Sequence, residues 1–356
     1  MRAAVMREWQ LRVDDVADPT PGPGQVLTKV LACGICGSDL HMLRHGAEMR
    51  ASMADLVGSA TGSSNGNDPM APKPFEPQHD TIMGHEFCCE VTELGAGCDN
   101  LKVGDVVVSM PVAFDAQGLH ALGYSNRYNG GYAELMVVNE LLALKVPNGL
   151  SPSMAALTEP LAVGIHAVAK SRIDGAESAV VLGAGPVGLA CIAALRMRGL
   201  GPIVVAEFSA KRRELALQLG ADVVVDPRET PAIEAWRKID GLRPLVIFEA
   251  VGVRGMLDEA MRMAPRGARI LVVGACMQQD TIHPMLGIGR ELNIQFVLGY
   301  EPAEFTSALS ALAEGEIDLA PWLTGTVTVD EVPQAFTDLG SPDTHAKILV
   351  VPGFAS

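Results

Sequence analysis

The chain has 356 residues, and 48% of them are hydrophobic. This length predicts about two domains, and the apolar content excludes a disordered chain. Lysine and arginine total 27 against 42 aspartate and glutamate, a formal net charge of −15. Nucleic acids and anionic membranes both attract basic surfaces, so this acidity argues against either as a partner.

No apolar run long enough to span a bilayer escapes interruption by glycine, proline or charge, which predicts a protein without a membrane span. The first residues lack the apolar core of a secretory signal. The seven cysteines are an odd number in a long chain, which favours reduced thiols over a disulfide framework. We therefore expect a cytoplasmic protein.

The first hundred or so residues are expected to form short strands joined by turns. A partly alternating pattern predicts a strand at 26–32, and a β-branched run predicts another at 103–109. Residues 19–24 form a connector rich in proline and glycine. The segment 50–77 is rich in Ser, Gly, Asn and Pro, which predicts a long loop. We expect this loop to border the entrance to a substrate site.

From residue 178 onward, short apolar runs alternate with helical segments, which predicts a doubly wound parallel sheet. After residue 300 the pattern predicts one more helix, at 303–315, and a final strand at 347–351. The strands predicted within the alternating region are 179–182, 203–206, 223–225, 245–248 and 269–273.

A glycine-rich turn follows the first of these strands. Gly183, Gly185 and Gly188 have the G-x-G-x-x-G spacing that lets a backbone approach a pyrophosphate and lets a helix pack closely on the strand. Glu207 ends the next strand, where a carboxylate can accept ribose hydroxyls and repel a 2′-phosphate, which favours NAD over NADP. The alternative is an ordinary turn between strand and helix. The basic run 211–213 could contact a phosphate, although a solvated helical turn is the simpler interpretation.

Potential metal ligands occur in two places. Cys33, Cys36, Ser38, Asp39 and His41 lie within nine positions, and a histidine and a glutamate are adjacent at 85–86. Thiolate, imidazole and carboxylate ligands with one open position are typical of catalytic zinc. From the spacing alone, a redox cysteine pair, buried thiols or a hydrogen-bonded core histidine remain open.

Taken together, several motifs resemble the zinc-containing medium-chain dehydrogenase/reductase family, which includes the alcohol dehydrogenases. The likeness is greatest to its sorbitol, threonine and 2,3-butanediol dehydrogenase branch, and it covers essentially the whole chain. It implies an α/β fold with two parts: a Rossmann NAD-binding domain at 156–299 and a mainly β, GroES-like catalytic domain at 1–155 and 300–356. The matching segments are 33–41, 84–87, 130–134, 159–163, 183–188 and 207–216.

The resemblance also implies roles for single residues. Asp39 would orient a histidine ligand, Ser38 would hydrogen-bond the substrate oxygen, and His41 would end a proton relay to solvent. The zinc ligands implied are Cys36, His85, Glu86 and Glu159, and which glutamate completes the set stays open. The coenzyme-binding residues implied are Gly183, Gly185, Pro186, Val187, Gly188, Glu207 and Arg212.

The sequence departs from the family pattern in two ways. The stretch 110–128, where the family carries four closely spaced cysteines, contains none, so we expect one catalytic zinc per chain and no structural zinc. Cys88 and Cys89 follow the histidine motif where smaller residues are usual. They would form a pocket wall or supply a spare ligand.

These features predict a zinc-dependent, NAD-linked alcohol dehydrogenase. It would convert a secondary alcohol, diol or polyol into a ketone, or the reverse, by hydride transfer. The alternatives are an L-threonine-type amino-alcohol dehydrogenase, a zinc-free quinone or enoyl reductase of the same superfamily, and a non-catalytic nucleotide-binding protein. Family likeness also implies a homodimer or homotetramer, in which the strands at 269–274 and 294–299 could pair across a two-fold axis.

Overall fold

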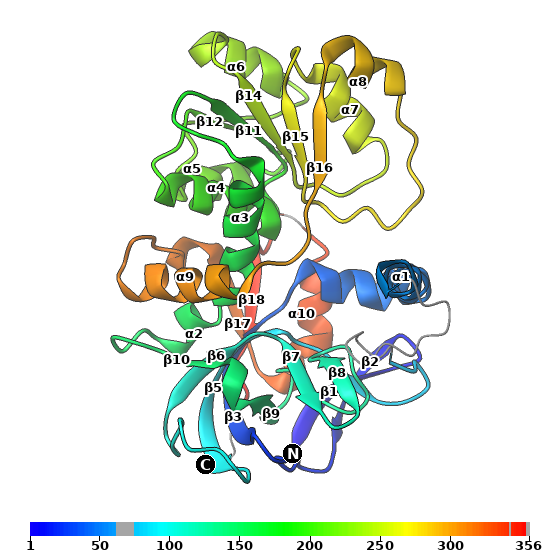
Figure 1. Cartoon of the computed structure of the whole chain (residues 1–356), viewed down its shortest axis with the longest axis vertical. Helices are drawn as coiled ribbons and strands as arrows, with labels where there is room; N and C mark the ends of the chain where they lie inside the picture. Colours follow the sequence, from blue (N-terminus) through cyan, green and yellow to red (C-terminus); the bar gives the residue numbers. More distant parts are fainter. Residues whose placement is uncertain (62–74, 342, 354–356) are drawn as a thin grey trace. The chain divides into compact units, whose positions relative to one another are not determined.

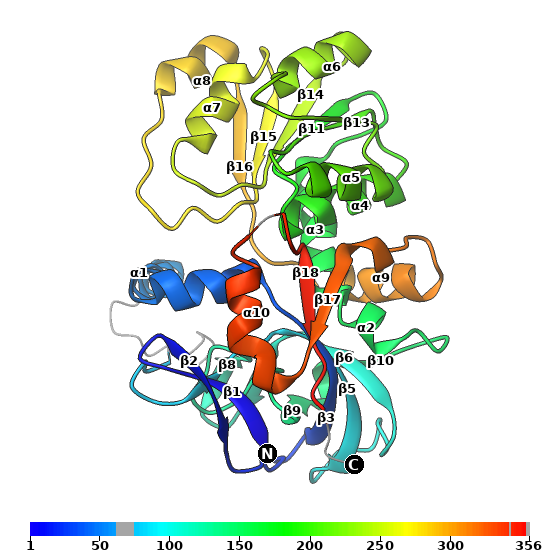
Figure 2. The same cartoon turned by 180° about the vertical axis from the view of Figure 1, so that it is seen from behind.

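A computed structural model of the chain describes residues 1–61, 75–341 and 343–353 (Figures 1 and 2). Its contacts divide the chain into two compact units. The first comprises Met1–Glu159, Leu323–Gly340 and Lys347–Ser356, and the second Pro160–Trp322 and Ser341–Ala346. Among the described residues, no helix is both long enough and apolar enough to cross a membrane.

The first unit is built mainly from β-strands. Its strands are β1 (Arg2–Arg7), β2 (Gln10–Asp15), β3 (Gln25–Gly34), β4 (Thr81–Ile82), β5 (Glu86–Leu94), β6 (Val106–Ser109), β7 (Val112–Asp115), β8 (Gly118–Ala121), β9 (Leu135–Asn139), β10 (Ala143–Lys145), β17 (Leu323–Val327) and β18 (Lys347–Val350). Its helical segments are α1 (Gly37–Thr61), α2 (Pro152–Ala155), α10 (Val332–Asp338) and the 3₁₀ turns η1 (Glu140–Leu142) and η3 (Val329–Glu331).

A seven-stranded sheet forms the centre of this unit, with the order β10-β6-β5-β3-β18-β17 and β9 paired to β3. A three-stranded sheet, β2-β1-β4, and the β7-β8 hairpin accompany it. The strand predicted at 26–32 is confirmed as part of β3, whose apolar side chains enter the core. The strand predicted at 103–109 is shorter, because Gly104 has a φ of +90° in the preceding turn.

The loop prediction for residues 50–77 is wrong over its first part. Residues 50–61 continue helix α1, which bends at His45 where the backbone leaves helical φ and ψ. The physical reason is composition: residues 47–60 include four Ala and two Met, which favour helix. The Ser-, Gly- and Asn-rich part of the predicted loop, 62–74, lies outside the described residues.

The second unit is an α/β structure. Its strands are β11 (Ser178–Leu182), β12 (Ile203–Ala206), β13 (Val223–Val225), β14 (Leu245–Glu249), β15 (Arg269–Val272) and β16 (Asn293–Phe296). Its helices are α3 (Thr158–Ser171), which begins two residues before the unit boundary, α4 (Pro186–Met197), α5 (Ala210–Gln218), α6 (Ala232–Asp240), α7 (Met256–Met263), α8 (Pro284–Arg290), α9 (Pro302–Ala313) and the turn η2 (Ala320–Trp322).

The six strands of this unit are all parallel, in the order β13-β12-β11-β14-β15-β16. Strand β11 is buried along its whole length, as expected for a parallel strand covered on both faces. Apolar side chains of α6 and α7 pack on one face of the sheet in a shared core. Strand order and helix packing together define a Rossmann-type doubly wound fold, so the predicted fold of this region is confirmed.

The boundary between the units differs from the domain limits expected from the sequence. Residues 300–322 belong to the Rossmann-type unit, whereas the sequence places all of 300–356 in the catalytic domain. Helix α9 explains the difference. It buries Phe305, Ala308 and Leu309, and Glu304 lies 2.7 Å from Nδ1 of His166 on α3. His166 is thus a paired, buried residue.

Candidate functional site

Cys36, His85 and Glu86 each present a ligand atom, and these atoms all lie within 4.8 Å of one another. Cys36 follows β3, while His85 and Glu86 stand at the start of β5, which pairs antiparallel with β3 and sets Gly34 opposite Glu86. A Cβ atom on Gly34 would lie 1.9 Å from a Glu86 oxygen, so only glycine allows this approach. A thiolate, an imidazole and a carboxylate match the donors of a zinc centre.

Asp39 contacts His85, a member of the donor group formed by Cys36, His85 and Glu86. Its Oδ1 lies 3.4 Å from His85 Nδ1, and its side chain is fully buried. Burial opposes the charged form of Asp39, but His85 and the hydrogen bonds from Tyr132 and Tyr124 together outweigh it, and the pKa of Asp39 is lowered. Because Nδ1 faces the carboxylate, Nε2 is the nitrogen that His85 can offer as a ligand.

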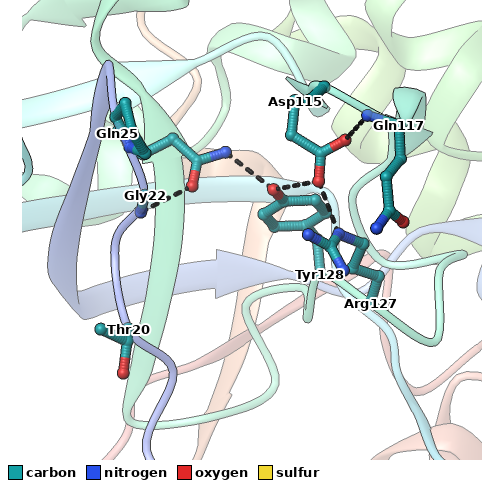
Figure 3. Close-up of a pocket in the computed structure, with 9 residues that line it drawn as sticks. Thr20, Gly22, Gln25, Asp115, Gln117, Arg127 and Tyr128 are labelled. Carbon is teal, nitrogen blue, oxygen red and sulfur yellow. Dashed lines mark hydrogen bonds and ion pairs between the residues drawn. The ribbon is translucent and has the colours of Figure 1, made fainter.

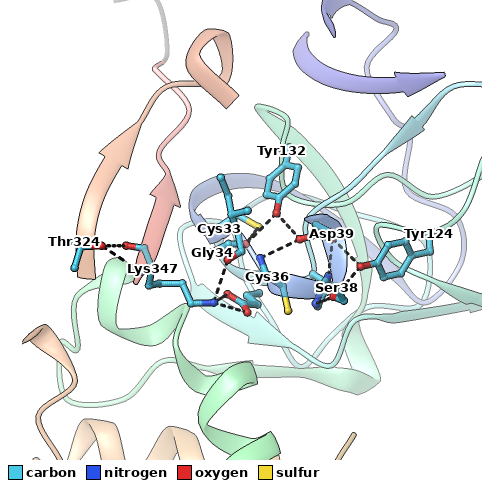
Figure 4. A network of polar contacts seen from close by, with 12 residues as sticks. Cys33, Gly34, Cys36, Ser38, Asp39, Tyr124, Tyr132, Thr324 and Lys347 are labelled. Atoms are coloured by element: carbon cyan, nitrogen blue, oxygen red, sulfur yellow. Dashed lines mark hydrogen bonds and ion pairs between the residues drawn. The ribbon is translucent and has the colours of Figure 1, made fainter. Parts of the chain in front are cut away.

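Two tyrosines that the sequence analysis did not single out hold Asp39 in place (Figure 4). Tyr132 donates to its Oδ2 at 2.5 Å, and Tyr124 donates to its Oδ1 at 2.7 Å. The backbone N–H of Cys36 also donates to Oδ2, at 3.1 Å. Tyr132 belongs to a matching motif at 130–134, whereas no sequence signal marks Tyr124.

Lys347 is a third residue that sequence reasoning missed, since it was assigned only to a strand. Its Nζ lies 2.7 and 2.6 Å from the two oxygens of Glu86, and it also donates to the carbonyl of Ile35 at 3.2 Å (Figure 4). Both side chains of this ion pair are almost completely buried. Glu86 is therefore both the buried counter-charge of Lys347 and a potential metal ligand.

Ser38 lies beside the donor group. Its Oγ is 3.5 Å from His85 Nε2 and 3.0 Å from the Tyr124 hydroxyl. His41 stands one turn further along α1 and is partly buried; burial, together with His45 and Arg44, lowers its pKa. Ser38 thus joins the predicted site by direct contact, while a relay ending at His41 stays a prediction.

Glu159 lies outside the three-donor group found among the described residues, at the first turn of α3. It helps to raise the pKa of Lys347, after Glu86 and Cys36. Cys33, Cys88 and Cys89 are fully buried, and none belongs to the donor group. Burial raises the pKa of Cys89 to about 12, so this thiol stays protonated.

The glycine-rich turn of the second unit has the geometry expected for a coenzyme loop. Gly183 has a φ of +87°, and a Cβ atom on Gly188 would lie 2.0 Å from the Gly183 carbonyl oxygen. Helix α4 begins directly after Gly185, with Pro186 in its first turn. The N-terminus of α4 thus presents free N–H groups, as a pyrophosphate site requires.

Glu207 and Arg212 lie beside this loop. The Glu207 carboxylate accepts from the N–H groups of Ala184, at 2.8 Å, and Ser209, at 2.9 Å, so it fastens the loop to the end of β12. The half-buried Arg212 has an Nε with no hydrogen-bond partner among the described residues, and its guanidinium approaches Gly185. A buried N–H group without a partner at such a loop can donate a hydrogen bond to an anionic or polar ligand.

The other two basic residues of this turn are engaged within the protein. Lys211 donates to the carbonyl of Thr344, and Arg213 donates to the carbonyls of Glu207 and Phe208 and to Asp226. These contacts favour a structural role for both residues over phosphate binding.

A pocket with a volume of about 500 Å³ lies elsewhere in the first unit (Figure 3). Gln25, Asp115, Arg127 and Tyr128 line it, and their polar groups bond to one another. None of its lining residues belongs to the Cys36–His85–Glu86 group. The pocket is therefore a feature separate from the candidate metal centre.

Comparison with known proteins connects these features. Residues 22–148 match the family described as alcohol dehydrogenase GroES-like domain, and residues 186–314 match the family of zinc-binding dehydrogenases. The (R,R)-butanediol dehydrogenase of Bacillus subtilis is 32% identical over 352 residues, which cover 96% of each chain. The L-threonine 3-dehydrogenase of Thermococcus kodakarensis is 32% identical over 326 residues, covering 87% of this chain and 85% of that one.

A solved structure, the 2R,3R-butanediol dehydrogenase of Bacillus subtilis, superposes with a TM-score of 0.81 at 30% identity and covers 99% of both chains. The chain therefore belongs to the zinc-containing medium-chain dehydrogenase/reductase family. It is an alcohol dehydrogenase with a GroES-like domain and a Rossmann-type domain, and its cofactors are zinc and a nicotinamide coenzyme. The predictions of family, fold class and enzyme class are thereby confirmed.

Proposed function

We propose that this enzyme oxidises a secondary hydroxyl of a small diol or polyol to a ketone, or catalyses the reverse reaction, with NAD as the hydride carrier. The observation that carries the proposal is the meeting of Cys36, His85 and Glu86 beside the Ser38 hydroxyl. The substrate class is supported by relatives named butanediol dehydrogenase and by the sorbitol dehydrogenase of Bacillus subtilis, which is 28% identical over 352 residues.

In this proposal Cys36, His85 and one glutamate hold the zinc. When bound, zinc supplies Lewis-acid polarisation of the alcohol or carbonyl oxygen. Asp39 keeps His85 in the orientation and tautomer that a ligand needs. Ser38 accepts the proton of the substrate hydroxyl and gives up its own hydroxyl proton, which His41 passes toward solvent.

Between the two glutamates, we favour Glu86 as the third ligand. Its oxygen lies within the donor group, whereas Glu159 stands outside it. Glu159 then acts through its charge, which reaches Lys347.

The coenzyme-binding roles follow from the second unit. Gly183, Gly185, Pro186, Val187 and Gly188 would bring the backbone and the N-terminus of α4 to the pyrophosphate. Glu207 would accept ribose hydroxyls with lone pairs that its two backbone contacts leave free, and its charge would disfavour a 2′-phosphate. Arg212 would use its open donor on the coenzyme.

The decisive experiment combines zinc analysis with coenzyme reduction. The purified enzyme should contain one zinc per chain and reduce NAD with a vicinal diol or polyol faster than with L-threonine. Cys36→Ser should lose both zinc and turnover, while Cys98→Ser, outside the donor group, should keep both. Preference for L-threonine would select the amino-alcohol alternative. Zinc-free protein without alcohol turnover would overturn the proposal in favour of a zinc-free reductase.

We also propose that the chain forms a homodimer through β16 in the cytoplasm. Strand β16 ends the parallel sheet, so its outer edge can pair with a second copy. Phe296 and Leu298 at this edge are 70% and 82% exposed. The strand at 269–274, also expected to pair, is β15, which lies between β14 and β16 and has no open edge. The seven free cysteines favour a reducing compartment.

A further inference from the structure

The Tyr124 hydroxyl joins Ser38 to Asp39. Its oxygen lies 3.0 Å from Ser38 Oγ and 2.7 Å from Asp39 Oδ1 (Figure 4). Its ring lies beside His85, with ring centroids 5.5 Å apart. Tyr124 follows the β7-β8 hairpin, far from Ser38 in sequence, and it has no part in the function proposed above.

The direction of the hydrogen bonds follows from counting donors. Asp39 receives hydrogen bonds from Tyr124, Tyr132 and the Cys36 N–H, as an ionised carboxylate would. Tyrosine has one hydroxyl hydrogen, and in Tyr124 it is donated to Asp39. The Tyr124 oxygen can then only accept from Ser38, so the single hydroxyl hydrogen of Ser38 points to Tyr124.

We propose that Tyr124 is a positioning residue that holds Ser38 as a hydrogen-bond acceptor toward the substrate hydroxyl. With its own hydrogen held by Tyr124, Ser38 turns its lone pairs toward its remaining neighbours. These include the candidate metal ligands, since His85 Nε2 lies 3.5 Å from Ser38 Oγ. Ser38 is only partly buried, so a small substrate can reach it. An alcohol substrate must then donate its hydroxyl hydrogen to Ser38 Oγ. This inference rests on the proposed alcohol oxidation.

Removing the Tyr124 hydroxyl should free the Ser38 hydroxyl to rotate and to compete as a donor. Tyr124→Phe should lower kcat for alcohol oxidation by roughly 10- to 100-fold, with little change in KM or zinc content. Tyr128→Phe is the matched control, because its hydroxyl bonds to Gln25 and Asp115 instead. It should retain the activity of the parent enzyme.

A double-mutant cycle separates this role from a merely structural one. If Tyr124 acts through Ser38, Tyr124→Phe should lower kcat much less in a Ser38→Ala background, where only the loss of its bond to Asp39 remains. Tyr132→Phe also removes a hydroxyl from Asp39 but does not contact Ser38, so its effect should be the same in both backgrounds. An equal loss from Tyr124→Phe with and without the Ser38 hydroxyl would overturn the inference.

A crystal structure of metal-free Tyr124→Phe gives a readout independent of turnover. The Ser38 side chain should leave its single rotamer or occupy several, and an unchanged Ser38 would contradict the inference. If the parent enzyme oxidises no alcohol, the proposed function fails. If the parent is active and Tyr124→Phe equals it, only the role of Tyr124 fails.

Discussion

Lys347 is fully buried, and burial alone would lower the pKa of its ammonium group. The opposite charges of Glu86 and Cys36 outweigh this effect, and the pKa is raised instead. A buried pair of this kind adds little net stability when it is complete, but breaking it leaves a charge without its partner. The buried Glu86 carboxylate therefore needs the positive charge of Lys347, unless a bound cation takes the place of that ammonium group.

Lys347→Met should destabilise the metal-free protein by about 3–5 kcal/mol, because the buried Glu86 carboxylate loses its counter-charge. The double variant with Glu86→Gln should recover much of this loss, since neither charge remains. Denaturant unfolding of the metal-free variants measures both effects.

Zinc binding should raise the melting temperature of Lys347→Met more than that of the parent, because the metal would supply the missing positive charge. Lys145→Met is the control. Lys145 pairs with Asp105 at 2.8 Å, but its side chain is 51% exposed, so its loss should change stability by less than about 1 kcal/mol. Equal destabilisation by the two lysine variants would show that the buried Lys347–Glu86 pair matters no more for stability than the exposed Lys145–Asp105 pair.

At the scale of elements, the β7-β8 hairpin occupies the stretch where the sequence lacks the family's cysteines. Asp115, at the end of β7, accepts from the Gln117 N–H at 2.7 Å, Arg127 Nε at 2.5 Å and the Tyr128 hydroxyl at 3.0 Å (Figure 3). Burial opposes its charge, but these donors prevail and lower the pKa of Asp115 to about 2. The hairpin is thus fastened by a hydrogen-bonded carboxylate. The prediction that the chain binds no structural zinc stays a prediction.

Asp115→Asn should lower the unfolding free energy near pH 7 by on the order of 1–3 kcal/mol. Because the folded pKa lies below the unfolded value, the ionised carboxylate stabilises the fold above about pH 4. This contribution is lost as the pH falls toward about 2, so stability should depend less on pH in the variant over this range. Denaturant titrations at several pH values measure the difference.

Asp14→Asn serves as the comparison for this pH series. Asp14 is exposed, and its ion pair with Arg12 spans 3.5 Å at the surface. It should behave as the parent does across the pH range. If Asp115→Asn retained the parent's acid sensitivity, Asp115 would not be the group that titrates.

At the scale of the whole molecule, β16 leaves one edge of the Rossmann-type sheet open among the described residues. The exposed Phe296 and Leu298 make this edge apolar, and an open apolar edge favours pairing with another chain. Phe296→Glu should place a charge in the proposed interface and shift the enzyme toward monomers.

Analytical ultracentrifugation would detect this shift as a fall in mass toward the single-chain value of 37.5 kDa. Leu242→Glu is the control, because Leu242 is 98% exposed between α6 and β14, away from β16. It should leave the assembly unchanged. A parent enzyme that is monomeric at all concentrations would refute the proposed dimer.

Features that depend on residues close together in the chain could be predicted from the amino-acid sequence. The alternation of strands and helices after residue 178 predicted the parallel sheet, and the spacing of Gly183, Gly185 and Gly188 predicted the turn into α4. The nine positions from Cys33 to His41 marked one side of the candidate metal centre. Local spacing carries this information because backbone geometry links neighbouring residues directly.

Contacts between groups far apart in the sequence became known from the fold. Strand β18 pairs antiparallel with β3, and β5 pairs with β3 on its other side, so Lys347 meets Glu86 across 261 residues. The turn after β8 brings Tyr124 to Ser38 across 86 residues. Such contacts depend on strand register and chain topology, which no local pattern encodes. For the same reason the sequence could not choose between Glu86 and Glu159, nor assign α9 to its unit.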